Sequence, residues 1–160
     1  MDKMRKTLDF ISEKASILIL GTTTVLVVWQ VVARYIFSAP IPWSETLAKY
    51  LFVWLVLINS AYIFGKKEHM NIAFFKEQLP HKVQLALEVF IELVILIFAV
   101  IILVLGGWAA VKVGMPQKDA ALKISMGYVY AALPISGIQI MLYTVCNLAE
   151  RITAIRKGDA

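Results

Sequence analysis

The sequence predicts an all-α integral membrane protein with four transmembrane helices. The chain of 160 residues is 60% hydrophobic and has a mean hydropathy of +0.76, whereas soluble domains are typically about half apolar. Four runs with few or no charges each approach the roughly 20 apolar residues that cross a bilayer as a helix. A membrane barrel would need strands of alternating polarity, which these runs lack. We expect helices at about 15–37, 44–65, 83–113 and 126–148, forming a single four-helix membrane domain over residues 1–160.

Lys and Arg residues are distributed unevenly between the two ends of these helices. Eleven of the sixteen fall in the N-terminal segment, in the connection 66–82 and in the C-terminal tail, and the other five fall at the opposite ends. Because cytoplasmic segments are enriched in basic residues, we predict that both termini are cytoplasmic. The basic residues are scattered at helix ends, so the net charge of +5 does not indicate nucleic-acid binding.

The N-terminal segment leads into the first helix. Met4, Leu8, Ile11 and Ala15 recur at helical spacing before the first long apolar run. This pattern predicts either a short amphipathic helix on the membrane surface or simply the first turns of the first helix. Further along the first helix, Gln30 cannot bond back to its own helix as easily as Thr22, Thr23 and Thr24 can. We therefore expect Gln30 to face another helix.

The second helix follows a short connection that contains two prolines. Ser44 is the expected N-cap, and Glu45 lies in the first turn, where the helix dipole favours an anion. Trp43 and Trp54 supply aromatic residues suited to the level of the lipid headgroups. Asn59 is the one strongly polar residue in the interior of this helix.

The second connection, 66–82, is the longest and the most charged of the three. Its aromatic pair Phe74–Phe75 stands beside Lys76, with further basic residues on both sides. Aromatic and basic residues mixed in this way next to a membrane predict a short amphipathic helix anchored to the cytoplasmic surface. A disordered loop is the alternative.

Small residues mark the third and fourth helices as sites of close packing. Gly106 and Gly107 lie in the third helix, and Gly127 and Ala131 lie in the fourth. Small side chains permit close approach between membrane helices, so we expect these residues to pack against neighbouring helices. Pro134 is expected to kink the fourth helix.

Residues that could carry transport or enzyme chemistry are scarce. A carrier needs polar groups at mid-membrane, and we identify Asn59 and Gln30 inside the apolar runs of the first two helices. The sequence has no H-E-x-x-H, G-x-S-x-G, P-loop or C-x-x-C motif, and Cys146 is its only cysteine. Glu88 and Glu92 are interpreted as a hydrated cluster at the membrane interface rather than as an ion site. We therefore predict no catalytic residue, no metal site and no cofactor in this chain.

The turn between the first two helices holds the remaining charges. Arg34 lies near the end of the first helix, and Glu45 and Lys49 stand four residues apart at the start of the second, in the order that favours a helix ion pair. Two interpretations stay open. Each charged side chain reaches the interface independently, or the three form a network that clasps the hairpin and, with Trp43, shapes an outward docking surface.

A set of residues in this region follows a known pattern. Arg-Tyr ends the first helix, a Pro-x-x-Trp-x-Glu turn follows, a basic residue stands four positions after the Glu, and Phe-x-Trp and Glu-His come later. The residues are Arg34, Tyr35, Pro40, Trp43, Glu45, Lys49, Phe52, Trp54, Glu68 and His69. This pattern, together with the stretch 125–137, resembles the small membrane subunit, DctQ type, of tripartite ATP-independent periplasmic (TRAP) transporters. Lys49 departs from the pattern, because Arg is commoner there.

The resemblance implies a role in transport. In such systems a large multi-helix membrane subunit binds Na⁺ and substrate and moves them by an elevator-type motion. A periplasmic substrate-binding protein delivers a carboxylate such as a C4-dicarboxylate or sialic acid. The small subunit is then a non-catalytic scaffold in the bacterial inner membrane, contacting the large subunit, the binding protein and lipids, with Na⁺ expected in the large subunit. The alternative is a stand-alone small homo-oligomeric membrane carrier or channel.

Overall fold

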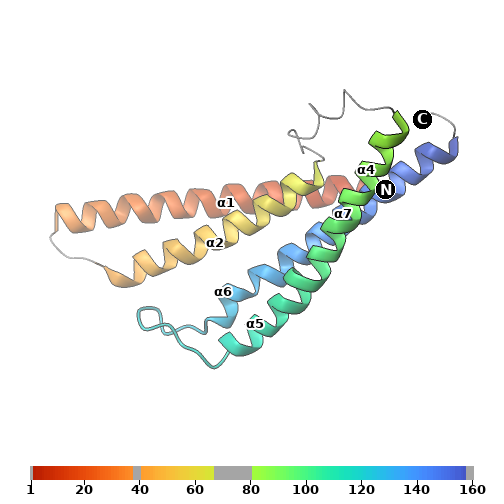
Figure 1. Ribbon diagram of the computed structural model, residues 1–160. Coiled ribbons are helices and arrows are strands. Elements are labelled where there is room, and N and C mark those ends of the chain that lie inside the picture. Colours follow the sequence, from red (N-terminus) through yellow and green to blue (C-terminus); the bar gives the residue numbers. More distant parts are fainter. Residues whose placement is uncertain (1, 38–40, 67–80, 158–160) are drawn as a thin grey trace.

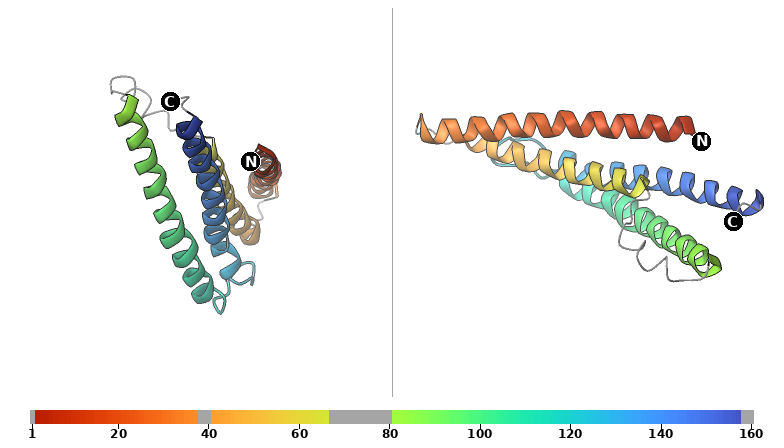
Figure 2. Two further views of the ribbon diagram at one scale, coloured as in Figure 1. Left: turned by 90° about the vertical axis from the view of Figure 1, so that its right-hand side faces the viewer. Right: turned by 90° about the horizontal axis from the view of Figure 1, so that it is seen from above.

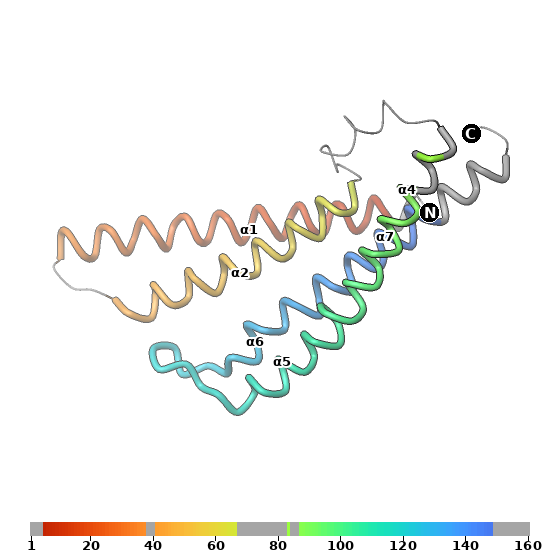
Figure 3. Tube along the Cα trace, viewed as in Figure 1, coloured from red at the N-terminus to blue at the C-terminus, as the bar shows by residue number. Residues whose placement is uncertain are grey.

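The computed structural model describes the backbone of residues 2–37, 41–66 and 81–157, and the side chains of residues 5–37, 41–66, 83 and 87–148 (Figure 3). Four helices are long and apolar enough to cross a membrane. They cover Arg5–Tyr35, Pro42–Gly65, Leu87–Gly114 and Gly127–Leu148. The predicted all-α membrane fold with four spanning helices is confirmed, and the orientation of the termini stays a prediction. The predicted surface anchor, residues 74–76, lies outside the described residues.

The first span belongs to helix α1 (Asp2–Tyr35), which runs without a break through the N-terminal segment. Of the two alternatives for that segment, the structure has the first turns of the spanning helix and not a separate helix. The hydroxyl groups of residues Thr22–Thr24 each donate to the carbonyl oxygen four residues earlier, at 2.8 Å. The threonines therefore satisfy their hydrogen-bonding groups within α1.

Helix α2 (Pro42–Gly65) begins two residues earlier than the sequence predicts. Ile41 is the N-cap residue, and Pro42 occupies the first helical position. There its fixed φ angle suits the helix and its missing N–H is not needed. Ser44 is buried, and its hydroxyl donates to the Ile41 carbonyl oxygen at 2.9 Å. The predicted N-cap role of Ser44 is therefore wrong.

The third span contains three consecutive helical segments. α4 (His81–Phe98) leads into a π-helix, η1 (Ala99–Gly106), and this leads into α5 (Gly107–Gly114). The predicted helix at 83–113 therefore exists, but its middle is wound more widely than an α-helix, with hydrogen bonds that span five residues. An uninterrupted apolar run contains no signal for this change, because the hydropathy of the two forms is the same.

The fourth span is divided into a short α6 (Gly127–Tyr130) and a long α7 (Ala132–Lys157). The break falls at Ala131, three residues before Pro134. Proline has no backbone N–H, so the Tyr130 carbonyl loses the hydrogen bond that a continuous helix would give it. The irregularity predicted for Pro134 takes the form of this break.

The four spans stand side by side in a single row rather than in a bundle (Figures 1 and 2). α1 packs along α2, α2 along α7, and α7 along η1 and α4, while α1 and the third span have no substantial contact within the described residues. The buried apolar cluster lies where α2, η1 and α7 meet. It consists of Ala61, Ala99, Leu103 and Ile140. A row one helix thick exposes apolar side chains on both of its broad faces.

Glycines allow the third and fourth spans to approach closely. A Cβ atom added to Gly107 would lie 2.9 Å from Leu133 Cβ and from Pro134 Cδ. One added to Gly137 would lie 2.7 Å from Leu103 Cβ. Contacts of this length leave no room for a methyl group, so glycine is needed at both positions.

The other predicted packing residues differ in their surroundings. A Cβ atom on Gly127 would lie 2.9 Å from the side chain of Met115, and Ala131, at the helix break, is partly buried. Gly106 is exposed, and beyond its adjacent helical backbone an added Cβ would meet within 4 Å just the carbonyl oxygen of Ile101 in its own helix, at 3.6 Å. Neighbouring residues of a helix point in different directions, which explains why Gly107 packs against α7 and Gly106 does not.

Candidate functional site at the hairpin end

The charged turn predicted from the sequence lies at one end of the row, which we call the hairpin end. It comprises the last turn of α1, the first turns of α2 and the connection 115–126, and it lies opposite the chain termini (Figure 1). Lys49 Nζ lies 2.8 Å from Glu45 Oε1, and both side chains are largely exposed. The ion pair expected from their spacing is therefore present. An exposed pair of this kind contributes little to stability.

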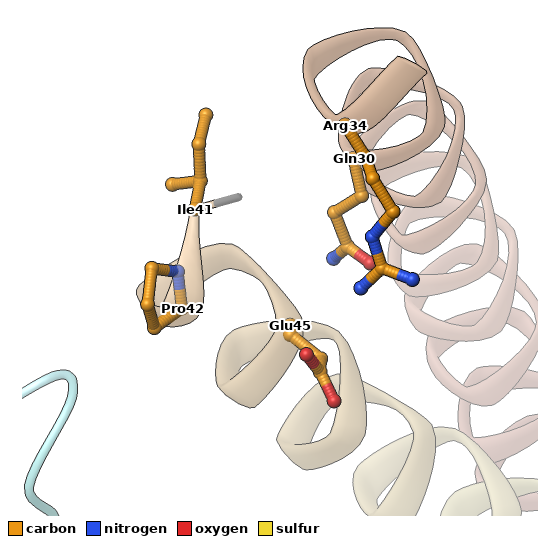
Figure 4. Close-up of a pocket in the computed structure, with 5 residues that line it drawn as sticks. All are labelled: Gln30, Arg34, Ile41, Pro42 and Glu45. Atoms are coloured by element: carbon orange, nitrogen blue, oxygen red, sulfur yellow. The ribbon is translucent and has the colours of Figure 1, made fainter. Parts of the chain in front are cut away.

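Arg34 does not join this pair. Within the described residues it makes no ion pair with Glu45. Instead, the two side chains line a cavity of about 90 Å³ between α1 and α2 (Figure 4). Its lining residues are Gln30, Arg34, Ile41, Pro42 and Glu45. An adjoining hollow is lined by Gln30, Val31, Arg34, Tyr35 and Glu45.

Gln30 is the third polar residue of this cavity. It projects from α1 on the same side as Arg34 (Figure 4). Its Nε2 atom is buried and has no hydrogen-bond partner among the described residues. The α1 wall of the cavity therefore carries the guanidinium of Arg34 and an unpaired amide N–H, and the α2 wall carries the Glu45 carboxylate. From the sequence we expected Gln30 to face another helix, but no hydrogen-bond partner could be named.

The side chain of Tyr50 links α2 to the connection 115–126 by hydrogen bonds. The Tyr50 hydroxyl donates to Asp119 Oδ2 at 2.7 Å, and Asp119 Oδ1 accepts the backbone N–H groups of Ala121 and Leu122, each at 2.8 Å. These hydrogen bonds, the one from Leu122 first and the one from Tyr50 second, hold the pKa of Asp119 below its ordinary value. Asp119 is therefore a carboxylate that fixes the connection against α2.

The connection itself is a compact turn. Lys118 and Ser125 form an isolated antiparallel bridge, and the Ser125 hydroxyl donates to the Met115 carbonyl oxygen at 2.8 Å. Lys118 and Lys123 are exposed on this turn. Together with Arg34 and Lys49 they make the hairpin end predominantly basic, since its described acidic residues are Glu45 and Asp119.

Sequence reasoning missed both attachments of Asp119. An aspartate whose carboxylate accepts the N–H two residues later is a common turn element, so the local part could have been inferred from the residues 119–122. The bond from Tyr50 joins residues 69 positions apart, and no pattern in the sequence indicates it. Tyr50 fits equally well as an aromatic residue at headgroup level.

The opposite end of α1 has a polar contact surface that was not predicted from the sequence. Tyr143 donates to Asp9 Oδ1 at 2.7 Å, and Gln139 Nε2 donates to Ser12 Oγ at 2.5 Å. Arg5 donates to the carbonyl oxygen of Gly65 at 2.7 Å, at the end of α2. The signal was present in the spacing, because residues 5, 9 and 12 share one face of a helix.

The other polar residues of the spans are held locally or enclosed. Asn59 Nδ2 donates to the carbonyl oxygen of Leu55, in the same helix, at 2.9 Å. Glu92 is buried, at 6% exposed, whereas Glu88 is only partly buried. Glu92 is therefore buried more deeply than we expected for a residue in a hydrated cluster at the membrane interface. Among the residues that the structure describes, no group of three His, Cys, Asp or Glu side chains is placed to hold a metal ion.

Comparison with known proteins gives a consistent result. Residues 23–154 match the family described as "Tripartite ATP-independent periplasmic transporters, DctQ component". The chain is 30% identical over 159 residues to the sialic acid TRAP transporter small permease protein SiaQ of Vibrio cholerae, covering 96% of this chain and 86% of that protein. It is 27% identical over 159 residues to a protein of Haemophilus influenzae named as a TRAP transporter small permease, covering 98% of each.

A longer protein also contains a matching stretch. Over 116 residues, or 72% of this chain, the sequence is 29% identical to part of the sialic acid TRAP transporter permease protein SiaT of Haemophilus influenzae. The match covers 19% of that protein. A unit similar to this chain is therefore found within a much larger permease.

Proposed function

Because the chain belongs to the DctQ family of TRAP transporter small membrane subunits, we propose that it is the scaffold subunit of a Na⁺-coupled transporter for a carboxylate. Small permease subunits of this family are non-catalytic and pair with a large permease, and the four spans make this chain a multi-pass membrane protein. In the proposed complex the large subunit binds Na⁺ and substrate and performs the elevator motion, and this chain stays still beside it in the bacterial inner membrane.

The row of helices is the observation that supports a scaffold role. A carrier that works alone needs a polar site enclosed near the middle of the membrane. Here α1 does not reach the third span within the described residues, so the helices form a layer and not a container. A layer one helix thick, apolar on both broad faces, is suited to widening a larger membrane protein. The match to part of the larger permease SiaT supports the same arrangement.

The proposed substrate is a carboxylate of the sialic acid or C4-dicarboxylate type. The relatives SiaQ and SiaT are both named for sialic acid transport, which supports the first of these. Recognition of the substrate is assigned to the large subunit and the binding protein, since Asn59, the strongly polar residue in the interior of α2, bonds to its own helix.

The hairpin end is the proposed rim of the docking surface for the periplasmic binding protein. Trp43 is half exposed there, and the Glu45–Lys49 pair is exposed beside it. Arg34 lies at the edge of the same surface. Lys118 and Lys123 extend the basic area onto the connection that Tyr50 and Asp119 hold in place. A basic area of this kind attracts an acidic face on a soluble partner.

Co-expression with the large subunit tests the scaffold role. A tag on this chain is expected to recover the large subunit in a one-to-one ratio. Proteoliposomes that contain both subunits, supplied with the binding protein and a Na⁺ gradient, are expected to take up substrate, whereas vesicles with this chain alone are not. Uptake by this chain alone would contradict the proposal and favour the homo-oligomeric carrier. Parallel assays with sialic acid and a C4-dicarboxylate identify the substrate class.

The docking role has its own test. Replacing Trp43 with Ala is expected to weaken the stimulation of uptake by the binding protein by about tenfold, because exposed aromatic residues often dominate interface energy. The matched control is Phe52→Ala, which removes an exposed aromatic ring of α2 at a deeper level. Equal effects of the two substitutions would contradict a docking role for Trp43.

A further inference from the structure

We propose that the cavity between α1 and α2 at the hairpin end binds the phosphoethanolamine headgroup of a phospholipid. This inference goes beyond the scaffold function and does not depend on it. It rests on the arrangement of three polar side chains around one small space, those of Gln30, Arg34 and Glu45 (Figure 4). Each wall of the cavity requires a different part of the ligand.

The α1 wall requires an oxyanion. Gln30 Nε2 is a buried hydrogen-bond donor without a partner among the described residues, and burying such a group costs free energy until an acceptor arrives. Arg34 lines the same cavity and makes no ion pair within the described part of the chain. A guanidinium binds phosphate oxygens through two parallel N–H groups. One phosphate would therefore satisfy both residues.

The α2 wall offers a carboxylate oxygen that can accept a second hydrogen bond from a cation. Glu45 faces the cavity, and Lys49 contacts it through Oε1. Its second oxygen, Oε2, has no hydrogen-bond partner within the described residues. A simple anion bound to Arg34 would stand close to this carboxylate and be repelled by it. A ligand with a phosphate and an ammonium group at its two ends is attracted by both walls.

The depth of the cavity favours a lipid as the source of these groups. Arg34 lies in the last turn of α1 and Glu45 in the first turn of α2, so both mark the ends of membrane spans. Tyr35 and Trp43, at the same level, are exposed, as aromatic residues at the headgroup level usually are. A phospholipid brings phosphate and amine to this depth while its acyl chains lie along the apolar surface of α1.

Two other ligands fit less well. A carboxylate from a partner subunit would satisfy Arg34 and leave Glu45 facing a second negative charge. Phosphatidylcholine carries a phosphate and a positive charge, but its quaternary ammonium has no N–H to donate to Glu45. The arrangement therefore selects an ethanolamine headgroup over choline, and a zwitterionic headgroup over the anionic phosphatidylglycerol.

Native mass spectrometry of the protein, purified from its membrane with the subunits that accompany it, tests this site. The sample is delipidated and then supplied separately with phosphatidylethanolamine, phosphatidylglycerol or phosphatidylcholine at equal concentration. We expect the highest occupancy with phosphatidylethanolamine. Arg34→Gln is expected to lower that occupancy about tenfold, the loss of one charged hydrogen-bonding group. Gln30→Leu, which removes only the amide, is expected to lower it by a smaller factor.

Two further variants separate the parts of the site. Glu45→Gln is expected to remove the preference for phosphatidylethanolamine over phosphatidylglycerol, because the partner of the ammonium is lost while Arg34 remains. Lys112→Gln is the matched control, since Lys112 is an exposed cation near the same end of the molecule but outside the cavity. It is expected to change no occupancy.

Three outcomes would overturn the inference. The first is unchanged lipid occupancy in both Arg34→Gln and Gln30→Leu. The second is a wild-type preference for phosphatidylglycerol or phosphatidylcholine. The third is loss of an accompanying subunit from Arg34→Gln with unchanged lipid occupancy of the remaining chain, which would identify a partner carboxylate as the ligand of Arg34.

Discussion

Helices α7 and α1 both contain an apolar stretch long enough to cross a membrane, yet their surroundings differ completely. Half of the most apolar window in the fourth span is buried inside the chain, and none of the corresponding window in α1 is. α7 has α2 on one side and η1 with α4 on the other, whereas α1 has α2 as its main neighbour. The apolar side chains of α7 therefore pack inside the chain, whereas those of α1 contact lipid or another subunit.

This difference shows in the glycines of the two helices. Gly137 of α7 lies against Leu103 with no space for a methyl group, whereas at Gly21 of α1 an added Cβ would meet nothing within 4 Å beyond its own stretch of helix. A helix in the interior of the row needs small residues to bring its neighbours close. A helix at its edge has no such need within this chain.

Substitution of these two glycines gives the largest expected contrast. Gly137→Ala is expected to lower the free energy of unfolding by about 1–3 kcal/mol, because the new methyl group overpacks against Leu103. Gly21→Ala is expected to leave it unchanged or raise it by up to about 1 kcal/mol, since alanine favours the helix. Reversible unfolding of the isolated chain in detergent measures both. Equal destabilisation by the two would contradict the assignment of α7 to the interior and α1 to the edge.

The tyrosines of the two helices give the next contrast. Tyr143 is completely buried and donates to Asp9. Tyr143→Phe is expected to destabilise the chain by about 1–2 kcal/mol, because it leaves a carboxylate without its partner. Tyr35→Phe, at an α1 residue that is 78% exposed, is expected to have no measurable effect. A larger loss of unfolding free energy from Tyr35→Phe than from Tyr143→Phe would contradict the assignment of α7 to the interior and α1 to the edge.

The connection that leads into the fourth span extends the comparison to the hairpin end. Tyr50→Phe removes the hydroxyl that holds Asp119, and we expect amide hydrogen exchange over residues 119–126 to rise about fivefold at neutral pH. Tyr62→Phe, farther along α2, serves as the control. Unchanged exchange after Tyr50→Phe would show that the turn is ordered without its attachment to α2.

The same attachment has a predicted pH dependence. The pKa of Asp119 in the folded protein lies below its ordinary value, so its stabilising effect is complete above that ordinary value and is lost as pH falls through the folded pKa. A spin label in a Lys123→Cys variant is expected to become mobile only in strongly acidic solution. Adding Asp119→Asn is expected to remove the pH step and give a mobile label at neutral pH. A step near neutral pH would contradict the assignment to Asp119.

The smallest effect on the free energy of unfolding is expected for the exposed ion pair at the start of α2. Lys49→Gln removes the ion pair with Glu45, whose side chains are both largely exposed. We expect no measurable change in the free energy of unfolding, because water and salt screen such a pair. Thermal unfolding at low and high ionic strength checks this. A clear salt-dependent loss would show that this pair stabilises the first turns of α2.

The sequence predicts the four spans well because transfer of an apolar run into lipid is a property of the run alone. The predicted helix at 44–65 agrees with α2 within two residues, and the difference comes from Pro42, a favoured first residue of helices. The sequence contains no pattern that indicates the π-helix η1, because Ala99–Gly106 is as apolar as the turns around it.

Contacts between distant residues were the part that sequence alone could not predict. The spacing of Glu45 and Lys49 correctly predicts their ion pair, because both lie on one helix. The positions of Arg34 and Gln30 depend on the angle between α1 and α2, and the bond from Tyr50 to Asp119 depends on how two connections fold. These are consequences of packing, and packing geometry is absent from hydropathy and charge.

The central place of α7 has a consequence for the order in which the chain assembles. α7 contains the last of the four spans to be synthesised, yet it is the helix that joins α2 to η1 and α4. Until it enters the membrane, the first hairpin and the third span share no substantial contact within the described residues. The first hairpin and the third span can therefore join into one row only once α7 lies between them. A chain cut after the third span would lack the α2·α7 and α7·η1 packing, so its first hairpin and third span would share no substantial contact within the described residues.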